Sequence, residues 1–211
     1  MDTAKSHLNT ITSWLGSGSV NTFGLPFAGK DTQGRLLADS LHAPLIGGGD
    51  ILRNSVIPPH VKTAIDRGEL APTEEYLQIV LPYLSREAFA GKPLVLSSVG
   101  RWEGEETGVM QATVAAGHPI KAVLSLNLDE REVWRRFEAL ERSEHHPRGY
   151  RHDDAADAIE VRLEEFRTKT LPVIAFYRSL GLVIDINSTQ PIEEVHQTIL
   201  ARLAHMAAAK D

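Results

Sequence analysis

The sequence contains no cysteine among its 211 residues. Disulfide bonds, thiol catalysis and zinc sites built on cysteine are therefore excluded. It also has no excess of basic residues, because the formal net charge is −6, and this balance disfavours a nucleic-acid-binding protein. No apolar run approaches the roughly 20 residues that cross a bilayer, and the N-terminus lacks the pattern of a signal peptide. We therefore expect a cytoplasmic protein that binds neither nucleic acid nor membrane.

The composition is otherwise that of an ordinary globular chain, with 42% hydrophobic and 24% charged residues. This length suits one α/β domain with a sizeable core. Residues 1–19 predict an added helical extension that ends in a Gly/Ser linker. Its apolar residues recur at helical spacing: Leu8, Ile11, Trp14 and Leu15. Because the helix lacks a basic polar face, we expect it to pack on the core and not to lie on a membrane surface.

Short strand patterns alternate with helical patterns through the main domain, 20–211. The strand candidates are Val20–Phe23, Pro44–Ile46, Leu94–Leu96, Ile120–Leu126 and Leu182–Ile186. The helical patterns fall at 30–40, 50–55, 60–67, 73–84, 104–116, 130–142, 153–180 and 192–207. The long pattern at 153–180 should bend near Pro172. The alternation predicts an α/β fold with a five-stranded parallel sheet and a ligand site at the carboxyl ends of its strands.

The strongest motif follows the first strand. Gly24-Leu25-Pro26-Phe27-Ala28-Gly29-Lys30 fits the phosphate-loop pattern G-x-x-x-x-G-K. Glycines let backbone N–H groups converge on phosphate oxygens, and Lys30 can offset charge on the outer phosphates of a nucleotide. The alternative is a glycine-rich turn that only joins strand to helix, which the agreement of strand, loop, lysine and helix disfavours. The expected ATP-binding residues are Gly24, Ala28, Gly29, Lys30, Asp31 and Thr32.

Four segments, in order along the chain, resemble adenylate kinases within the nucleoside monophosphate kinase family. They are 24–33 (family pattern G-x-P-G-A-G-K-G-T-Q), Gly49–Arg53 (G-D-M/L-L-R), Arg101 (the arginine of D-G-F-P-R), and Arg151–Asp154 with Arg162 (R-x-D-D…R). The resemblance implies a P-loop NTPase-type kinase with a helical insert at about 47–84 for the nucleoside monophosphate. It also implies a short lid at about 143–152, without the zinc of long-lid members.

The resemblance assigns a set of cations to two nucleotides. Arginine suits phosphate oxygens because its donors form a planar fork. The residues implied at the acceptor monophosphate are Gly48, Asp50, Arg53, Leu70, Arg101 and Glu105. The residues implied in catalysis are Lys30, Arg101, Arg136, Arg151 and Arg162. Taken alone, any one of these arginines is more often a solvated surface residue.

The sequence departs from the family around the phosphate loop. Phe27 replaces a loop glycine and is expected to narrow the space near the transferring phosphate. Asp31 replaces the glycine after the lysine. Ser97 and Ser98 stand where the family has Asp-Gly, whose aspartate holds Mg²⁺ through water. The resemblance implies Mg²⁺ with ATP, and Asp31 could reach the water shell of that ion from the other side. The alternative is a solvent-facing carboxylate at a helix start.

The acceptor base stays open at this point. Glu105 stands where adenylate kinases have a glutamine that forms hydrogen bonds with adenine, and Gly48 stands where they have a threonine near the base. An ionised carboxylate only accepts hydrogen bonds, so it suits N1–H and N2–H₂ of guanine; alternatively, Glu105 points to solvent. The resemblance implies ATP + AMP ⇌ 2 ADP, catalysed by a monomer. The alternatives are a kinase for another nucleoside monophosphate such as GMP, and a weakly active regulatory module that binds nucleotide.

Overall fold

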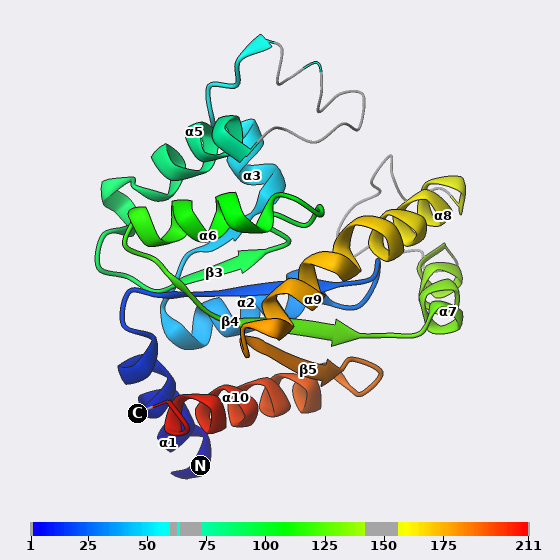
Figure 1. Ribbon diagram of the computed structural model, residues 1–211. Helices are drawn as coiled ribbons and strands as arrows, with labels where there is room; N and C mark the ends of the chain where they lie inside the picture. Colours follow the sequence, from blue (N-terminus) through cyan, green and yellow to red (C-terminus); the bar gives the residue numbers. More distant parts are fainter. Residues whose placement is uncertain (1, 60–62, 64–72, 142–155, 211) are drawn as a thin grey trace.

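The computed structural model describes residues 2–59, 63, 73–141 and 156–210. Among them, five strands form a parallel sheet in the order β2-β3-β1-β4-β5 (Figure 1). The strands are β1 (Ser19–Gly24), β2 (Leu45–Gly47), β3 (Leu94–Ser97), β4 (Ile120–Asn127) and β5 (Val183–Asn187). Each agrees with its expected strand to within one residue at either end. The expected α/β fold with a five-stranded parallel sheet is therefore confirmed.

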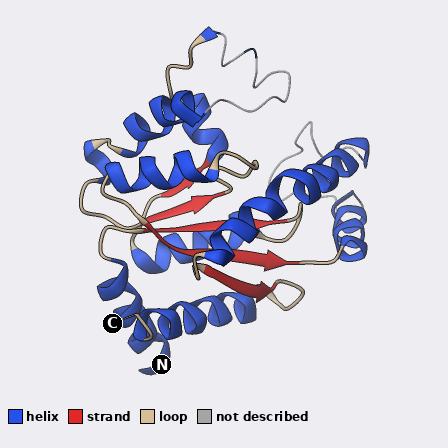
Figure 2. Cartoon of the chain, viewed as in Figure 1, coloured by secondary structure: helices blue, strands red, loops and turns tan. Residues whose placement is uncertain are grey.

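Helices cover both faces of this sheet (Figure 2). One face packs against α1 (Asp2–Leu15), α2 (Lys30–Leu41) and α10 (Ile192–Ala208). The other packs against α5 (Thr73–Leu84), α6 (Glu106–Ala115) and α9 (Leu171–Ser179). All six residues of β1 are buried, with Val20 in the first core and Phe23 in the second. Burial on both faces explains why the central strands are short apolar runs without alternation.

Most of the remaining described elements lie at the carboxyl edge of the sheet, whereas one 3₁₀ turn precedes the amino end of β3. They are α3 (Gly48–Arg53), the 3₁₀ turn η1 (Glu87–Phe89), α7 (Glu130–Glu141), α8 (Ala156–Glu165) and the π-helical turn η2 (Phe166–Thr170). A third small core joins α7 and α8 to the loop after β1 through Leu25, Phe137 and Leu163. The helix expected at 60–67 falls almost wholly outside the described residues.

The long helix expected over 153–180, with a bend near Pro172, is confirmed in its described part, where α8, η2 and α9 follow one another without a gap. Pro172 lacks an N–H, and its ring conflicts with the carbonyl of Thr168 four residues earlier, so the backbone before it widens into a π-helical turn. The distortion thus precedes the proline and does not centre on it. It sets the direction in which Phe166 and Thr170 face the carboxyl edge of the sheet.

The N-terminal helix α1 packs against α10, as expected for a helix on the core (Figure 1). Ile11 and Leu15 are fully buried there, and the ammonium group of Lys121 donates a hydrogen bond to the carbonyl of Trp14. The following linker meets the amino end of β3, where the N–H of Leu94 donates to the carbonyl of Gly18. This helix therefore supports the edge of the sheet opposite the phosphate loop. No helix within the described ranges is long and apolar enough to cross a membrane.

Candidate active site

The phosphate loop connects β1 to α2 at the carboxyl edge of the sheet. Gly24 ends β1 where a Cβ atom would lie 2.8 Å from the carbonyl oxygen of Leu126 on β4, so only glycine allows this approach. Gly29 precedes α2 with φ 85°. The Nζ atom of Lys30 donates hydrogen bonds to the carbonyls of Gly24 at 2.8 Å and of Leu25 at 2.7 Å. The loop therefore curls around the lysine at the positive end of α2.

Two residues near this loop have left-handed backbones without being glycine. Phe27 has φ 60° and Ser98, just after β3, has φ 54°. Both stand where the family has glycine, so the backbone keeps the conformation that glycine prefers. The ring of Phe27 lies 6.2 Å from that of Phe137 on α7 and packs against the third core. It is not among the residues that line the pocket described next, and the narrowing of the space near the transferring phosphate stays a prediction.

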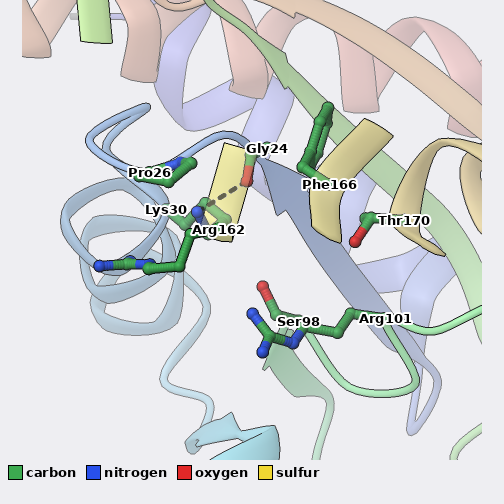
Figure 3. Close-up of a pocket in the computed structure, with 8 residues that line it drawn as sticks. All are labelled: Gly24, Pro26, Lys30, Ser98, Arg101, Arg162, Phe166 and Thr170. Atoms are coloured by element: carbon green, nitrogen blue, oxygen red, sulfur yellow. Dashed lines mark hydrogen bonds between the residues drawn. The ribbon is translucent and has the colours of Figure 1, made fainter. Parts of the chain in front are cut away.

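A pocket opens beside the phosphate loop (Figure 3). It is lined by Gly24, Pro26, Lys30, Ser98, Arg101, Arg162, Phe166 and Thr170. Figure 3 shows Lys30 between the loop residues and the segment that carries Ser98 and Arg101. Three cations from three separate elements therefore face one space: Lys30 from α2, Arg101 from the loop after β3, and Arg162 from α8. Such a convergence suits polyphosphate oxygens.

Arg101 is held only loosely in the structure. Its side chain is 47% exposed, and its Nη2 atom lies 3.5 Å from Oε2 of Glu165. An ion pair this exposed and this long contributes little. A phosphate group, which offers several anionic oxygens to the guanidinium fork, can therefore displace Glu165 at small cost.

Arg136 on α7 lies beside the phosphate loop, and its contacts are with the backbone and with Glu132. Its Nη1 donates to the carbonyl of Phe27 at 2.9 Å, and its Nη2 donates to the carbonyl of Ser188 at 2.7 Å. Its Nε pairs with Glu132 at 2.8 Å, and the paired arginines lower the pKa of that carboxyl. Arg136 thus connects the phosphate loop to the segment after β5 through contacts that the sequence did not reveal.

The expected acceptor residues are only partly described. A Cβ atom at Gly48 would lie 2.9 Å from the carbonyl oxygen of Ser98, so glycine here allows α3 to approach the loop after β3. Asp50 accepts a hydrogen bond from the N–H of Gly47 at 2.9 Å and so stabilises the start of α3. Leu70, Arg151, the side chain of Arg53 and the whole expected lid, 143–152, lie outside the described residues.

Glu105 is buried just before α6, with 9% of its surface exposed. The alternative that it points to solvent is therefore wrong. Its Oε2 accepts a hydrogen bond from the N–H of Trp102 at 3.2 Å. Burial raises the pKa of Glu105 to about 7, against the opposing effects of the Trp102 hydrogen bond and the charge of Arg101. Near neutral pH this carboxyl group therefore exists in both its protonated and its ionised form.

Oxygen ligands suited to Mg²⁺ lie at the edge of the phosphate loop. The hydroxyl of Ser97 donates to Oδ1 of Asp31 at 3.5 Å, and the buried Oγ1 of Thr22 has no hydrogen-bond partner in the described part of the chain. No group of three or more His, Asp or Glu side chains among the described residues could bind a metal by itself. The donors present fit an ion that is bound mainly by phosphate oxygens and water, as Mg²⁺ usually is.

Comparisons with known proteins agree with this geometry. A family model described as "Adenylate kinase" matches residues 22–182. The chain is 32% identical over 206 residues to a curated adenylate kinase of Gemmatimonas aurantiaca, covering 85% of this chain and 96% of the relative. It is 33% identical over 190 residues to that of Thermobifida fusca, covering 87% and 97%. For the enzyme of Prochlorococcus marinus, the identity is 32% over 185 residues, covering 85% and 94%.

The chain belongs to the adenylate kinase family. It therefore has the P-loop NTPase-type fold, and it is a phosphotransferase of the nucleoside monophosphate kinase type. Phe166 and Thr170 line its pocket, yet the sequence analysis did not single them out. The signal that could have found them is Pro172, because a proline inside a long helical pattern distorts the preceding turn and redirects its side chains.

Proposed function

We propose that this protein is an adenylate kinase that transfers the γ-phosphoryl group of Mg·ATP to AMP in the reversible reaction ATP + AMP ⇌ 2 ADP. The observation that carries the proposal is the pocket in which Lys30, Arg101 and Arg162 converge beside the phosphate loop. A module that binds one nucleotide through its loop does not need a second cation on the far side of the pocket. The family match and the names of the relatives support the same reaction.

In this proposal the protein acts by positioning and by stabilising charge. Backbone N–H groups of the loop and the start of α2 hold the phosphates of ATP. Lys30 exchanges its two carbonyl contacts for the transferring phosphoryl group, because charge-assisted bonds to phosphate are stronger. Arg101 holds the phosphate of AMP, and Arg162 stabilises charge on the group in transfer. No general base is required, since the attacking phosphate oxygen is already anionic.

Further parts of the proposal rest on the resemblance in sequence. The residues concerned are Ala28, Gly29 and Thr32 for ATP; Gly48, Asp50, Arg53, Leu70 and Glu105 for AMP; and Arg136 and Arg151 for catalysis. The proposed insert at 47–84 and lid at 143–152 would close over both nucleotides and exclude water, which otherwise competes as acceptor. Mg²⁺ as the companion of ATP, a monomeric state and a cytoplasmic location also belong to the proposal.

GMP is the second candidate acceptor, and the buried carboxyl group of Glu105 is the observation that favours it. The ionised form of Glu105 can accept from N1–H and N2–H₂ of guanine, whereas the protonated form can both donate and accept, as an amide does. Parallel rates with AMP, GMP, CMP and UMP decide between acceptors. We expect the highest kcat/KM with AMP, and a higher value with GMP would replace AMP in the proposal.

A coupled assay of ADP formation from ATP and AMP tests the proposed reaction and its residues. We expect Lys30→Gln to lower kcat by about 100-fold or more. Arg101→Gln should raise KM for AMP by about tenfold or more while KM for ATP changes little. The matched control is Arg178→Gln on α9, because Arg178 is also half exposed and paired with a carboxylate, Asp185. Its rate should match the wild type.

Wild-type protein that binds ATP but forms no ADP from AMP or any other monophosphate would overturn the proposal and favour a regulatory module. A loss of activity in Arg178→Gln as large as in Arg101→Gln would show that the effect of Arg101 is not specific to the pocket. Thermal melts of each variant separate these outcomes from a failure to fold.

A further inference from the structure

Two oxygen-bearing side chains at the phosphate loop have exchanged places relative to the general arrangement of P-loop proteins. In that arrangement a Ser or Thr hydroxyl directly follows the loop lysine, and a carboxylate at the end of a neighbouring strand completes the magnesium site. Here Asp31 directly follows Lys30, and Ser97 ends β3, the neighbour of β1. Relative to that arrangement, the carboxylate is on the helix and the hydroxyl is on the strand, whereas the chain's own family has a glycine after the lysine.

The structure brings the exchanged groups together. The Oγ atom of Ser97 donates to Oδ1 of Asp31 at 3.5 Å, although the two residues are 66 positions apart. This distance is at the long end of the hydrogen-bond range, so the oxygens are adjacent without being tightly joined. Ser98, the next residue after Ser97, and Lys30, the residue before Asp31, both line the pocket. The pair therefore stands at the border of the proposed ATP phosphate site.

A third oxygen supports the same position. Thr22 lies directly beside Ser97 in the sheet register, so their side chains share one face. That face is the α2 side, since Val20 and Val95, two residues earlier on each strand, belong to the core packed against α2. Oγ1 of Thr22 is buried and lacks a hydrogen-bond partner in the residues that the structure describes. Leaving a buried hydroxyl without a partner costs about 1–3 kcal/mol, which suits a place that a bound group completes.

We propose that Asp31 and Ser97 together hold, through its water shell, the Mg²⁺ that accompanies ATP, with the hydroxyl of Thr22 behind them. One carboxylate suffices, because Mg²⁺ keeps several waters and takes its other ligands from nucleotide phosphates. This inference rests on the proposed function, since it needs Mg·ATP in the phosphate loop. It assigns to Asp31 and Ser97 jointly the role that a strand-end carboxylate has elsewhere.

The exchange predicts a rescue. Asp31→Ser removes the carboxylate and should weaken the coupling between metal and nucleotide. Asp31→Ser combined with Ser97→Asp returns the carboxylate to the strand and the hydroxyl to the helix, and should restore the coupling. A merely structural role of Asp31 predicts no such rescue, because the double variant changes more of the site than the single one.

Calorimetric titration with AMP-PNP, an ATP analogue with a non-hydrolysable β–γ link, measures this coupling without any turnover. The measured quantity is the ratio of the Kd for AMP-PNP in the presence of EDTA to the Kd in the presence of Mg²⁺. We expect Asp31→Ser to lower this ratio by about tenfold, as the loss of an outer ligand of a metal does. The double variant should return to within about threefold of the wild type. Asp39→Ser, an exposed aspartate on the same helix, is the matched control and should leave the ratio unchanged.

A ratio that stays within twofold of the wild type in Asp31→Ser, or a double variant that falls below the single one, would overturn the inference. If Asp31→Ser folds poorly, Asp31→Asn, which keeps the size of the side chain, replaces it, and the same decrease in the ratio of Kd values is expected. A wild type that binds AMP-PNP equally with and without Mg²⁺ also overturns it, while the ADP assay still decides the proposed function. A wild type that binds no AMP-PNP would instead remove the proposed function itself.

Discussion

The burial of Glu105 makes a prediction about stability as a function of pH. The change is Glu105→Gln, which removes the ionisable group and keeps an oxygen that can accept from the N–H of Trp102. Burial raises the pKa of Glu105 from its ordinary value of 4.5 to about 7. A shift of this size corresponds to ~3 kcal/mol of unfolding free energy. We therefore expect the wild type to carry a penalty at high pH that the variant lacks.

The direction follows from the two protonation states. Below pH 4.5 the carboxyl group is neutral in both the folded and the unfolded chain, so it adds no pH-dependent penalty. As the pH rises from 4.5 to 7, the unfolded chain releases the proton while the folded chain keeps it, and the stability of the wild type falls. Above pH 7 the penalty stays constant. Arg101 and the Trp102 N–H oppose the shift and Glu106 adds to it, and the value of about 7 already includes all three.

Urea denaturation of both proteins, followed by circular dichroism at pH 4.5, 6 and 8, is the assay. The unfolding free energy of Glu105→Gln minus that of the wild type should increase by ~3 kcal/mol from pH 4.5 to pH 8. Glu103→Gln, which changes an exposed carboxylate two residues earlier, is the control and should show no comparable trend. A difference for Glu105→Gln that is the same at all three pH values would refute the reasoning.

Three further predictions follow from the same region. The ratio of kcat/KM with AMP to that with GMP should fall as the pH passes 7, because ionised Glu105 can no longer donate to adenine, and Glu105→Gln should make the ratio independent of pH. Ser98→Gly should raise the unfolding free energy by ~0.5–1 kcal/mol in a urea titration, since glycine relieves the left-handed backbone at φ 54°. Arg136→Gln should lower it by ~1–3 kcal/mol and raise KM for ATP, because the carbonyls of Phe27 and Ser188 lose their donors.

The sequence predicts those parts of the fold that local chemistry determines. Strands covered on both faces are short apolar runs between loops, so all five could be located. The strand order could not, because the position of β1 between β3 and β4 depends on contacts far apart in the chain. The break in the long helix was anticipated from Pro172. Its place at Phe166–Thr170 depends on which carbonyls lose their partners before the proline.

In the candidate site, too, local motifs could be predicted from the sequence, whereas contacts between distant segments could not. Lys30, Arg101 and Arg162 lie in recognisable motifs, and the structure brings all three to one pocket. The hydrogen bond from Arg136 to the carbonyl of Ser188 could not be predicted, because it joins two segments 52 residues apart. Nor could the burial of Glu105, since glutamate is seldom buried without a charged partner.

Whether a position near the phosphate site must be glycine depends on the room for a Cβ atom there, and not on the backbone angle alone. At Gly24 a Cβ atom would lie 2.8 Å from a carbonyl of β4, and at Gly100 it would collide with Cγ2 of Val109 on α6. No rotation of a side chain relieves the first contact, which is with the backbone, whereas the second is with a valine side chain whose χ1 angle is restricted in a helix. Phe27 and Ser98 also have left-handed backbones, but each accommodates its side chain, so substitution there costs only strain of about 1–2 kcal/mol. The backbone of the phosphate site is therefore held by the neighbouring β4 and α6, and its side chains can change, as at Phe27 and Ser98, without altering its shape.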